Sequence, residues 1–100
     1  MVEIIQSETF RSWFAGLRDR QVKSIVDARI RRVSLGNFGD IKPLNGPVSE
    51  LRIDHGPGYR IYITRRGSTL AVLLAGGTKR TQDADIKRAL KIASAWKGLA

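Results

Sequence analysis

The sequence predicts an α+β domain: a small antiparallel sheet with an N-terminal helical hairpin on one face and a C-terminal helix. Two observations predict this class. Apolar residues repeat at helical spacing near both ends of the chain, and with a period of two between residues 48 and 64. The expected order is strand, helix, helix, strand, strand, strand, helix. With 100 residues, of which 42% are hydrophobic, we expect a single domain over residues 1–100.

The N-terminal part of the chain predicts a strand and two helices. Residues 2–6 alternate well enough for a short strand, and Ser7 can cap a helix that runs to about residue 17. Asp19 can cap a second helix, and Gly36 lies where a left-handed residue after the helix belongs. The apolar stripes of the two helices are Phe10, Trp13, Phe14 and Leu17, and Val22, Ile25, Val26, Ile30 and Val33. Both stripes predict core contacts, so the helices form a hairpin that covers one side of the sheet.

A loop and a β-hairpin are expected next. Residues 36–47 are rich in glycine, proline, asparagine and aspartate, which is typical of a loop. Strands are expected over residues 48–54 and 59–64, and the glycine-rich turn at 55–58 predicts that they pair antiparallel. Alternation places one set of side chains against the helices, namely Leu51, Ile53, Tyr59 and Ile61. The opposite face then carries Glu50, Arg52, Asp54, Arg60 and Tyr62.

The last part of the chain predicts a buried strand and a helix. After a turn at 65–68, residues 69–75 are almost entirely apolar, which favours a strand covered on both faces. The chain leaves this strand through residues 76–80 and enters a helix at about 83–97, where Asp83 and Asp85 favour the N-terminal end. The apolar stripe of this helix is Ile86, Ala89, Leu90, Ala93 and Trp96.

The charge balance narrows the class of partner. Eighteen Lys and Arg residues stand against nine Asp and Glu residues, a formal net charge of +9. A field of this size favours polyanions such as nucleic acid, and RNA is the partner we expect.

Several chemistries are excluded by composition. The chain has one histidine and no cysteine, so a two-histidine ribonuclease centre, a Cys–His pair and a zinc cluster are not available. The carboxylates are scattered, and no spacing suggests a two-metal site, so we expect no metal and no cofactor. The segment Gly76-Gly77-Thr78-Lys79 matches only part of a phosphate-binding loop.

Targeting signals are not expected either. The first residues lack a basic region followed by a long apolar run, which argues against a signal peptide. The longest apolar run, at about residues 70–75, is too short for a bilayer span. We therefore expect a cytoplasmic protein with no membrane partner.

The residues most suited to chemistry lie on the polar face of the β-hairpin. Arg52 and Arg60 can hold phosphate there, Tyr62 can stack on an unpaired base, and Lys79 and Arg80 emerge where the last strand ends. Arginine can also stabilise the charge that develops on a reacting phosphate. An alternative stays open, in which Arg52 and Arg60 belong to a solvated face and form salt bridges to Glu50 or Asp54.

Other polar residues have two interpretations. His55 could act as a base or contact RNA, although a lone histidine in a glycine-rich turn is usually inert. Arg65 and Arg66 are expected to be solvated in a turn. The basic residues of the last helix can simply form its solvent-exposed face; they are Lys87, Arg88 and Lys91.

Three segments resemble a known family. Residues 50–53 (ELRI), 56–62 (GPGYRIY) and 73–82 (LLAGGTKRTQ), followed by Asp85 and Ile86, resemble the RelE/ParE superfamily of toxins. They are most similar to the HigB-like "addiction module killer" branch of type II toxin–antitoxin systems. The pattern of Phe10, Trp13 and Leu17 also fits, so the resemblance covers about residues 2–97.

The resemblance implies a microbial RNase fold and a ribosome-dependent mRNA endoribonuclease, a metal-independent mRNA interferase that inhibits translation and arrests growth. In such toxins the 2′-hydroxyl of the mRNA attacks the adjacent phosphate in the ribosomal A site. On matching positions, Arg60 would stabilise the phosphate, and Lys79 or Arg80 would hold it or protonate the leaving oxygen. Arg52 and Lys42 would bind the RNA backbone or ribosomal RNA.

The chain departs from some relatives in one respect. It has no tyrosine or histidine after Tyr62, where these relatives place an active-site residue. The general base stays open, with Lys79 as the candidate. Other members of the superfamily inhibit DNA gyrase, and a non-catalytic RNA- or ribosome-binding module is a further alternative.

The resemblance also implies a set of partners. A cognate antitoxin, expected to be a small helix-turn-helix protein, would neutralise the toxin. Operator DNA would be bound only through that antitoxin, whereas mRNA and the ribosome would be direct partners.

Overall fold

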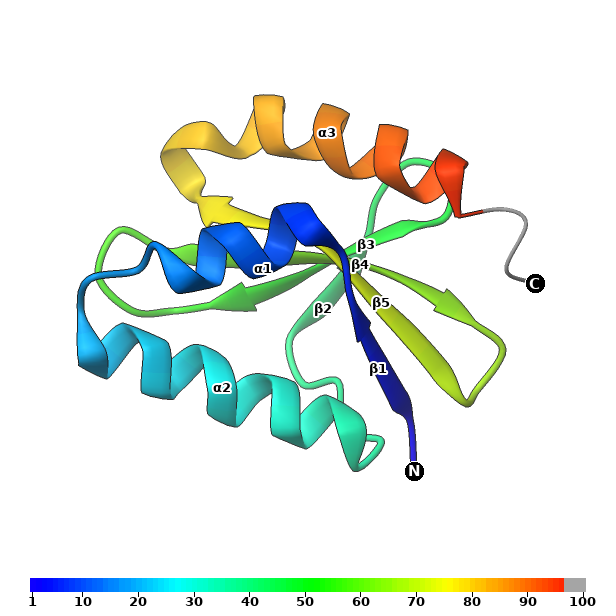
Figure 1. The fold of residues 1–100 in the computed structure, drawn as a ribbon, viewed down its shortest axis with the longest axis horizontal. Helices are drawn as coiled ribbons and strands as arrows, with labels where there is room; N and C mark the ends of the chain where they lie inside the picture. The colour runs from blue at the N-terminus through cyan, green and yellow to red at the C-terminus, as the bar shows by residue number, and fades with distance from the viewer. Residues whose placement is uncertain (97–100) are drawn as a thin grey trace.

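The computed structural model describes residues 1–96, which contain five strands, three α-helices and a short 3-10 helix. The strands are β1 (Glu3–Gln6), β2 (Ile41–Pro43), β3 (Val48–Ile53), β4 (Tyr59–Arg66) and β5 (Leu70–Thr78). The helices are α1 (Glu8–Ala15), α2 (Arg20–Ser34), η1 (Lys79–Thr81, the 3-10 helix) and α3 (Gln82–Ala95) (Figure 1). The predicted α+β class, with a helical hairpin before the sheet and a helix after it, is confirmed. The expected last residues of α3, up to 97, lie partly outside the described residues.

One sheet contains all five strands, in the order β1-β5-β4-β3-β2. Two of its features differ from the expected antiparallel sheet of four strands. The edge strand β2 lies within the expected loop, and its proline is tolerated because an edge strand can lack a ladder hydrogen bond. The other difference is that β1 pairs with β5 in parallel. Parallel neighbours need a long connection, and here the helical hairpin and three strands lie between them in the chain.

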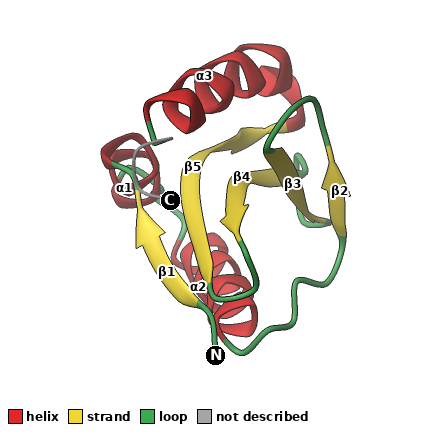
Figure 2. Ribbon diagram, turned by 90° about the vertical axis from the view of Figure 1, so that its right-hand side faces the viewer, coloured by secondary structure: helices red, strands yellow, loops and turns green. Residues whose placement is uncertain are grey.

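Helices cover both faces of the sheet. On one face α1 and α2 bury Phe10, Val22, Val26 and Val33 against Leu51, Ile53, Ile61, Ile63 and Leu73. On the other face lies α3 (Figure 2). It buries Ala89 and Ala93 against Val48, Tyr62, Val72 and Leu74. The strand β5 lies between these two cores, and residues 71–77 within it are buried. This explains why that strand is almost entirely apolar.

The predicted N-caps of α1 and α2 and the left-handed residue after α2 are confirmed, whereas α1 ends at Ala15, two residues before its expected end. The hydroxyl of Ser7 accepts a hydrogen bond from the backbone N–H of Phe10, 3.0 Å away, at the start of α1. The carboxylate of Asp19 accepts one from Gln21 N–H, at 2.8 Å, at the start of α2. Gly36 follows α2 with φ +94°, a conformation that costs glycine little and other residues much.

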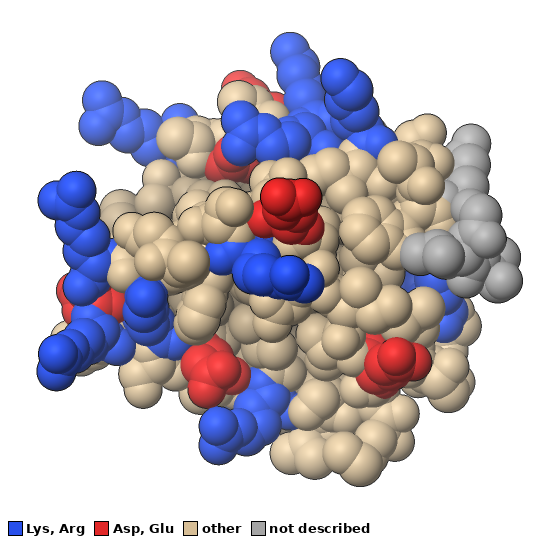
Figure 3. All heavy atoms as spheres, in the orientation of Figure 1, with Lys and Arg blue, Asp and Glu red and all other residues tan. Residues whose placement is uncertain are grey.

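Basic side chains are not spread evenly over the surface. In Figure 3, Lys and Arg gather over α3 and at the end of the molecule where the α1–α2 connection and the β3–β4 turn lie. The exposed basic residues of α3 are Lys87, Arg88 and Lys91. Within residues 1–96, no helix is long and apolar enough to cross a membrane.

Candidate functional site

A surface pocket of about 510 Å³ lies where the β3–β4 hairpin meets the end of β5. Three of the predicted site residues line it: Arg52 from β3, Arg60 from β4 and Lys79 from η1. The sheet register brings them together, because Arg52 is the direct cross-strand partner of Arg60, and Arg60 is that of Gly77. Lys79 then donates its backbone N–H to the carbonyl of Gly58, 2.8 Å away, which fixes η1 against the hairpin turn.

Two arginines directly opposite each other on neighbouring strands repel, so their positions depend on nearby carboxylates. Glu50, only 1% exposed, lies two residues before Arg52 on β3. Its Oε1 accepts a hydrogen bond from Arg60 Nη1 at 2.5 Å, and lies 4.0 Å from Arg52 Nε. The alternative that these arginines form salt bridges to Glu50 therefore describes the geometry present in the structure.

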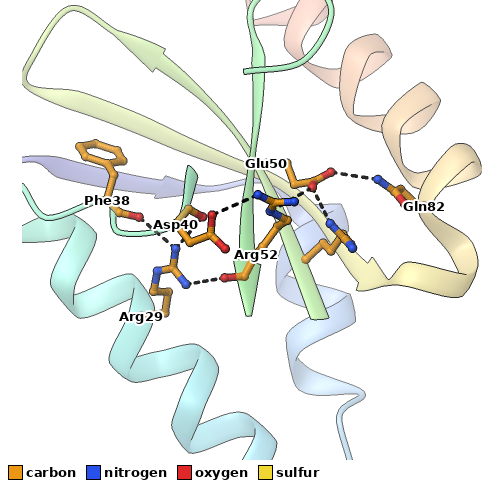
Figure 4. Close-up of polar contacts among 7 residues, drawn as sticks. Arg29, Phe38, Asp40, Glu50, Arg52 and Gln82 are labelled. Atoms are coloured by element: carbon orange, nitrogen blue, oxygen red, sulfur yellow. Dashed lines mark hydrogen bonds and ion pairs between the residues drawn. The ribbon is translucent and has the colours of Figure 1, made fainter. Parts of the chain in front are cut away.

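Further contacts complete this network (Figure 4). Gln82, the first residue of α3, donates from Nε2 to Glu50 Oε2 at 3.2 Å. Asp40 Oδ1, just before β2, accepts from Arg52 Nη2 at 3.3 Å. Asp54 also lines the pocket, and it forms no ion pair among residues 1–96.

A buried arginine of α2 supports one wall of the pocket. Arg29 is 8% exposed and donates to three backbone carbonyls: Phe38 at 3.0 Å, Asp40 at 2.8 Å and Arg52 at 2.7 Å (Figure 4). Burial lowers the pKa of Arg29, and the nearby Arg32 lowers it further. These contacts attach the loop that contains Asp40 to both α2 and β3, so Asp40 is held beside Arg52.

The charges within the pocket nearly cancel. Arg52, Arg60 and Lys79 are matched by Asp40, Asp54 and the underlying Glu50. The net charge of +9 is therefore located mainly elsewhere on the molecule. The cationic side chains of the pocket can bind an anionic group of a ligand. Its carboxylates can accept hydrogen bonds from a neighbouring group of the same ligand.

The remaining predicted site residues lie outside the pocket lining. Arg80 is exposed in η1, and His55 is half-buried in the hairpin turn. Lys42 is exposed on the edge strand β2, opposite Glu50 in the sheet. This places Lys42 close to the pocket along the same face of the sheet.

The prediction that Tyr62 stacks on RNA is wrong. Tyr62 is fully buried, because α3 packs over this part of the sheet face. Burial, together with the nearby Glu50 and Asp85, raises the pKa of the Tyr62 phenol to about 12, so the group is neutral near pH 7. Its hydroxyl has no hydrogen-bond partner within the described chain. The aromatic ring that does line the pocket belongs to Tyr59, which was expected chiefly in the core and also packs against it.

A second hollow, of about 620 Å³, lies between α1 and α3. It is lined by Glu8, Thr9, Ser12, Trp13, Gly76 and Arg88, and none of the predicted site residues contributes to it. A side chain at Gly76 would collide with the ring of Trp13, which explains the glycine at this place in β5. The pocket between the β3–β4 hairpin and the end of β5 is therefore the candidate site.

Sequence reasoning missed three residues of the network, Arg29, Asp40 and Gln82, and it named Glu50 only as a possible salt-bridge partner of the arginines. A signal for Arg29 was present, since it falls on the helical stripe of Val22, Val26 and Val33. Asp40 and Gln82 come from a loop and from α3, and no local pattern relates either to β3. No group of three or more His, Cys, Asp or Glu side chains within residues 1–96 is arranged to hold a metal ion.

Comparison with known proteins identifies a relative. The chain is 47% identical over 92 residues to a protein from Haemophilus influenzae (strain ATCC 51907 / DSM 11121 / KW20 / Rd) that is described as an uncharacterized protein. The match covers 92% of this chain and 93% of the relative. No protein-family model matches the chain.

Proposed function

We propose that this chain, which belongs to the same family as the Haemophilus influenzae protein, is the toxin of a type II toxin–antitoxin system. Its activity would be that of a ribosome-dependent mRNA endoribonuclease that inhibits translation in the cytoplasm. The observation that carries the proposal is the meeting of Arg52, Arg60 and Lys79 in one pocket of a strongly basic molecule. The likeness of residues 50–53, 56–62 and 73–82 to RelE/ParE toxins supports the same activity.

The proposed reaction needs a cation for the phosphate, a proton acceptor and a proton donor. The guanidinium of Arg60 would stabilise the negative charge that grows on the phosphate oxygens as the 2′-oxygen attacks phosphorus. Lys79 carries an ammonium group, which can donate a proton to the leaving 5′-oxygen but cannot accept one. Asp54, a carboxylate of the same pocket, would accept the proton of the 2′-hydroxyl. The P–O5′ bond breaks, leaving a 2′,3′-cyclic phosphate and a 5′-hydroxyl.

The pocket also offers surfaces for binding. The ring of Tyr59 can contact a base, and Arg52 and Lys42 can contact the RNA backbone on either side of the reacting phosphate. The exposed cations of α3 and the basic end of the molecule would attract the ribosome and its RNA through long-range charge.

The test is cleavage of a ribosome-bound transcript, followed by primer extension. Lys79→Ala, Arg60→Lys and Asp54→Asn should each slow cleavage by roughly 100-fold or more, because each removes one part of the proposed chemistry. Arg60→Lys is preferred to alanine because a lysine can still pair with the buried Glu50.

Arg31→Ala is the matched control, since it removes one exposed positive charge from α2, outside the pocket. This variant should cleave at close to the original rate. Intact mRNA together with a DNA-damage response would point instead to gyrase inhibition. Salt-sensitive RNA binding without cleavage would point to a binding module.

The proposal includes a cognate antitoxin, expected to be a small helix-turn-helix protein that joins the complex to its operator. Co-expression with the neighbouring reading frame should restore growth and yield a copurifying complex. Growth arrest that no neighbouring protein relieves would contradict this part of the proposal.

A further inference from the structure

We infer that Glu50 is the positioning residue for Arg60, holding its guanidinium in the orientation that a bound phosphate meets. The inference rests on the proposed function for its catalytic consequence, and on the geometry alone for the orientation. Glu50 was expected only as one possible salt-bridge partner of two arginines. The structure places its carboxylate at the centre of contacts from β3, β4 and α3.

Within residues 1–96, the Arg60 guanidinium pairs with Glu50 alone. Its Nη1 is 2.5 Å from Glu50 Oε1, and its buried Nε has no partner there. The Arg60 side chain is 13% exposed, and the residue lines the pocket. An arginine has five N–H donors, so the second Nη1 hydrogen and both Nη2 hydrogens stay unpaired while one is bound to Glu50 and Nε is buried. Glu50 therefore orients Arg60 without using up its capacity to bind an anion.

Glu50 itself is held from the opposite side. Gln82 donates to Oε2 from the first turn of α3, while Arg60 occupies Oε1. The carboxylate is 1% exposed, so water does not compete for these contacts. A buried carboxylate with both oxygens occupied has little freedom to rotate, and the same holds for the guanidinium attached to it.

This arrangement has an electrostatic cost for binding. The negative charge of Glu50 lies directly behind Arg60 and weakens its attraction for phosphate. Loss of that charge makes the pocket more positive, so it should strengthen the binding of an anion. It should also weaken catalysis, because Arg60 loses its orientation. A residue that served only stability would change both quantities in the same direction.

The test compares Glu50→Gln with Glu3→Gln, which removes one exposed carboxylate from β1 and gives the same net charge. Binding is measured with an oligonucleotide that carries a 2′-deoxy sugar at the cleavage position, and cleavage by single-turnover kinetics. Glu50→Gln should bind severalfold tighter and cleave roughly tenfold more slowly. Glu3→Gln should change neither by as much as twofold.

The orientation of Arg60 is measured separately by NMR of its side-chain nitrogens. In the original protein, hindered rotation should give distinct Nη signals, and in Glu50→Gln these should merge. A second variant, Gln82→Ala, keeps the charge of Glu50 and removes its support from α3. Gln82→Ala should broaden the Arg60 Nη signals and slow cleavage severalfold, without tightening the binding of the oligonucleotide. If Glu50→Gln does not fold, Gln82→Ala alone tests the inference.

The outcomes separate the two proposals. If the original protein cleaves no RNA but the Arg60 signals respond as described, the proposed function fails and the orienting role of Glu50 stands. If folded Glu50→Gln and Gln82→Ala both cleave at the original rate with unchanged Arg60 signals, the positioning role is overturned while the ribonuclease proposal is unaffected.

Discussion

Arg60 and Glu50 form a buried ion pair, and burying two charges costs free energy of desolvation. Removing two charges from water costs several kcal/mol each, and their attraction repays this only when the geometry is good. Arg60 Nη1 and Glu50 Oε1 are 2.5 Å apart, and Gln82 occupies the second carboxylate oxygen. A well-packed apolar pair would serve stability equally well. The pair is therefore better explained by its place at the pocket than by a contribution to folding.

Tyr62 allows a prediction at the same scale. Its hydroxyl is buried without a partner in the described chain, and such a group costs roughly 1–3 kcal/mol. Tyr62→Phe should therefore fold, keep its RNA-related activity and unfold with a free energy equal to or about 1 kcal/mol above the original. Urea denaturation measures this. A loss of RNA binding in a folded variant would contradict the burial of this hydroxyl.

The pH dependence of stability tests the same residue. The pKa of Tyr62 is about 12 in the folded protein, above the ordinary value of 10.0. Between these values the unfolded chain loses the phenol proton and the folded chain keeps it, so stability falls as pH rises from about 10 to 12. The loss from this group should be about 2 kcal/mol, and Tyr62→Phe should remove it. Tyr59→Phe, at a half-buried position, is the matched control.

At the scale of elements, α2 is joined to the sheet by a polar contact as well as by its apolar stripe. Arg29 supplies this contact through three carbonyls in the loop before β2 and in β3. The short strand β2 forms next to this loop, so one side chain of α2 supports a strand that local patterns did not predict.

Arg29→Met tests this role. Methionine keeps the apolar stem but leaves the three carbonyls without their donor, so the free energy of unfolding should fall by about 2–4 kcal/mol. Hydrogen exchange should increase in residues 37–43, which the arginine holds. Arg32→Met, at an exposed position of the same helix, should change either quantity little. Equal effects in the two variants would contradict the role of Arg29.

At the scale of the whole molecule, attraction for RNA and chemistry at the pocket are separated in space. The pocket charges nearly cancel, whereas exposed cations gather on α3 and at the end that carries the hairpin turn. Long-range attraction should therefore depend on the helices, and the reaction on the pocket.

The salt dependence of RNA binding tests this separation. Lys87→Ala/Lys91→Ala should reduce the slope of log affinity against log salt by about 0.7 for each phosphate that the protein no longer neutralises. Lys79→Ala should change the slope less than the double variant while it slows cleavage more. Filter binding of a non-cleavable oligonucleotide between low and moderate salt provides both slopes. An unchanged slope in the double variant would place the attracting charges elsewhere.

The sequence by itself determined the elements other than β2, and the faces of their side chains. Ser7, Asp19 and Gly36 act through contacts within a few residues, and the alternation of Leu51, Ile53 and Ile61 follows from strand geometry, so local chemistry was sufficient. Only the tertiary structure decided what covers each face. Periodicity shows that Glu50, Arg60 and Tyr62 share a face, but α3 buries Tyr62 there and leaves Arg60 at the open end, paired with Glu50. That outcome depends on packing between segments far apart in the chain, which no local pattern of residues encodes.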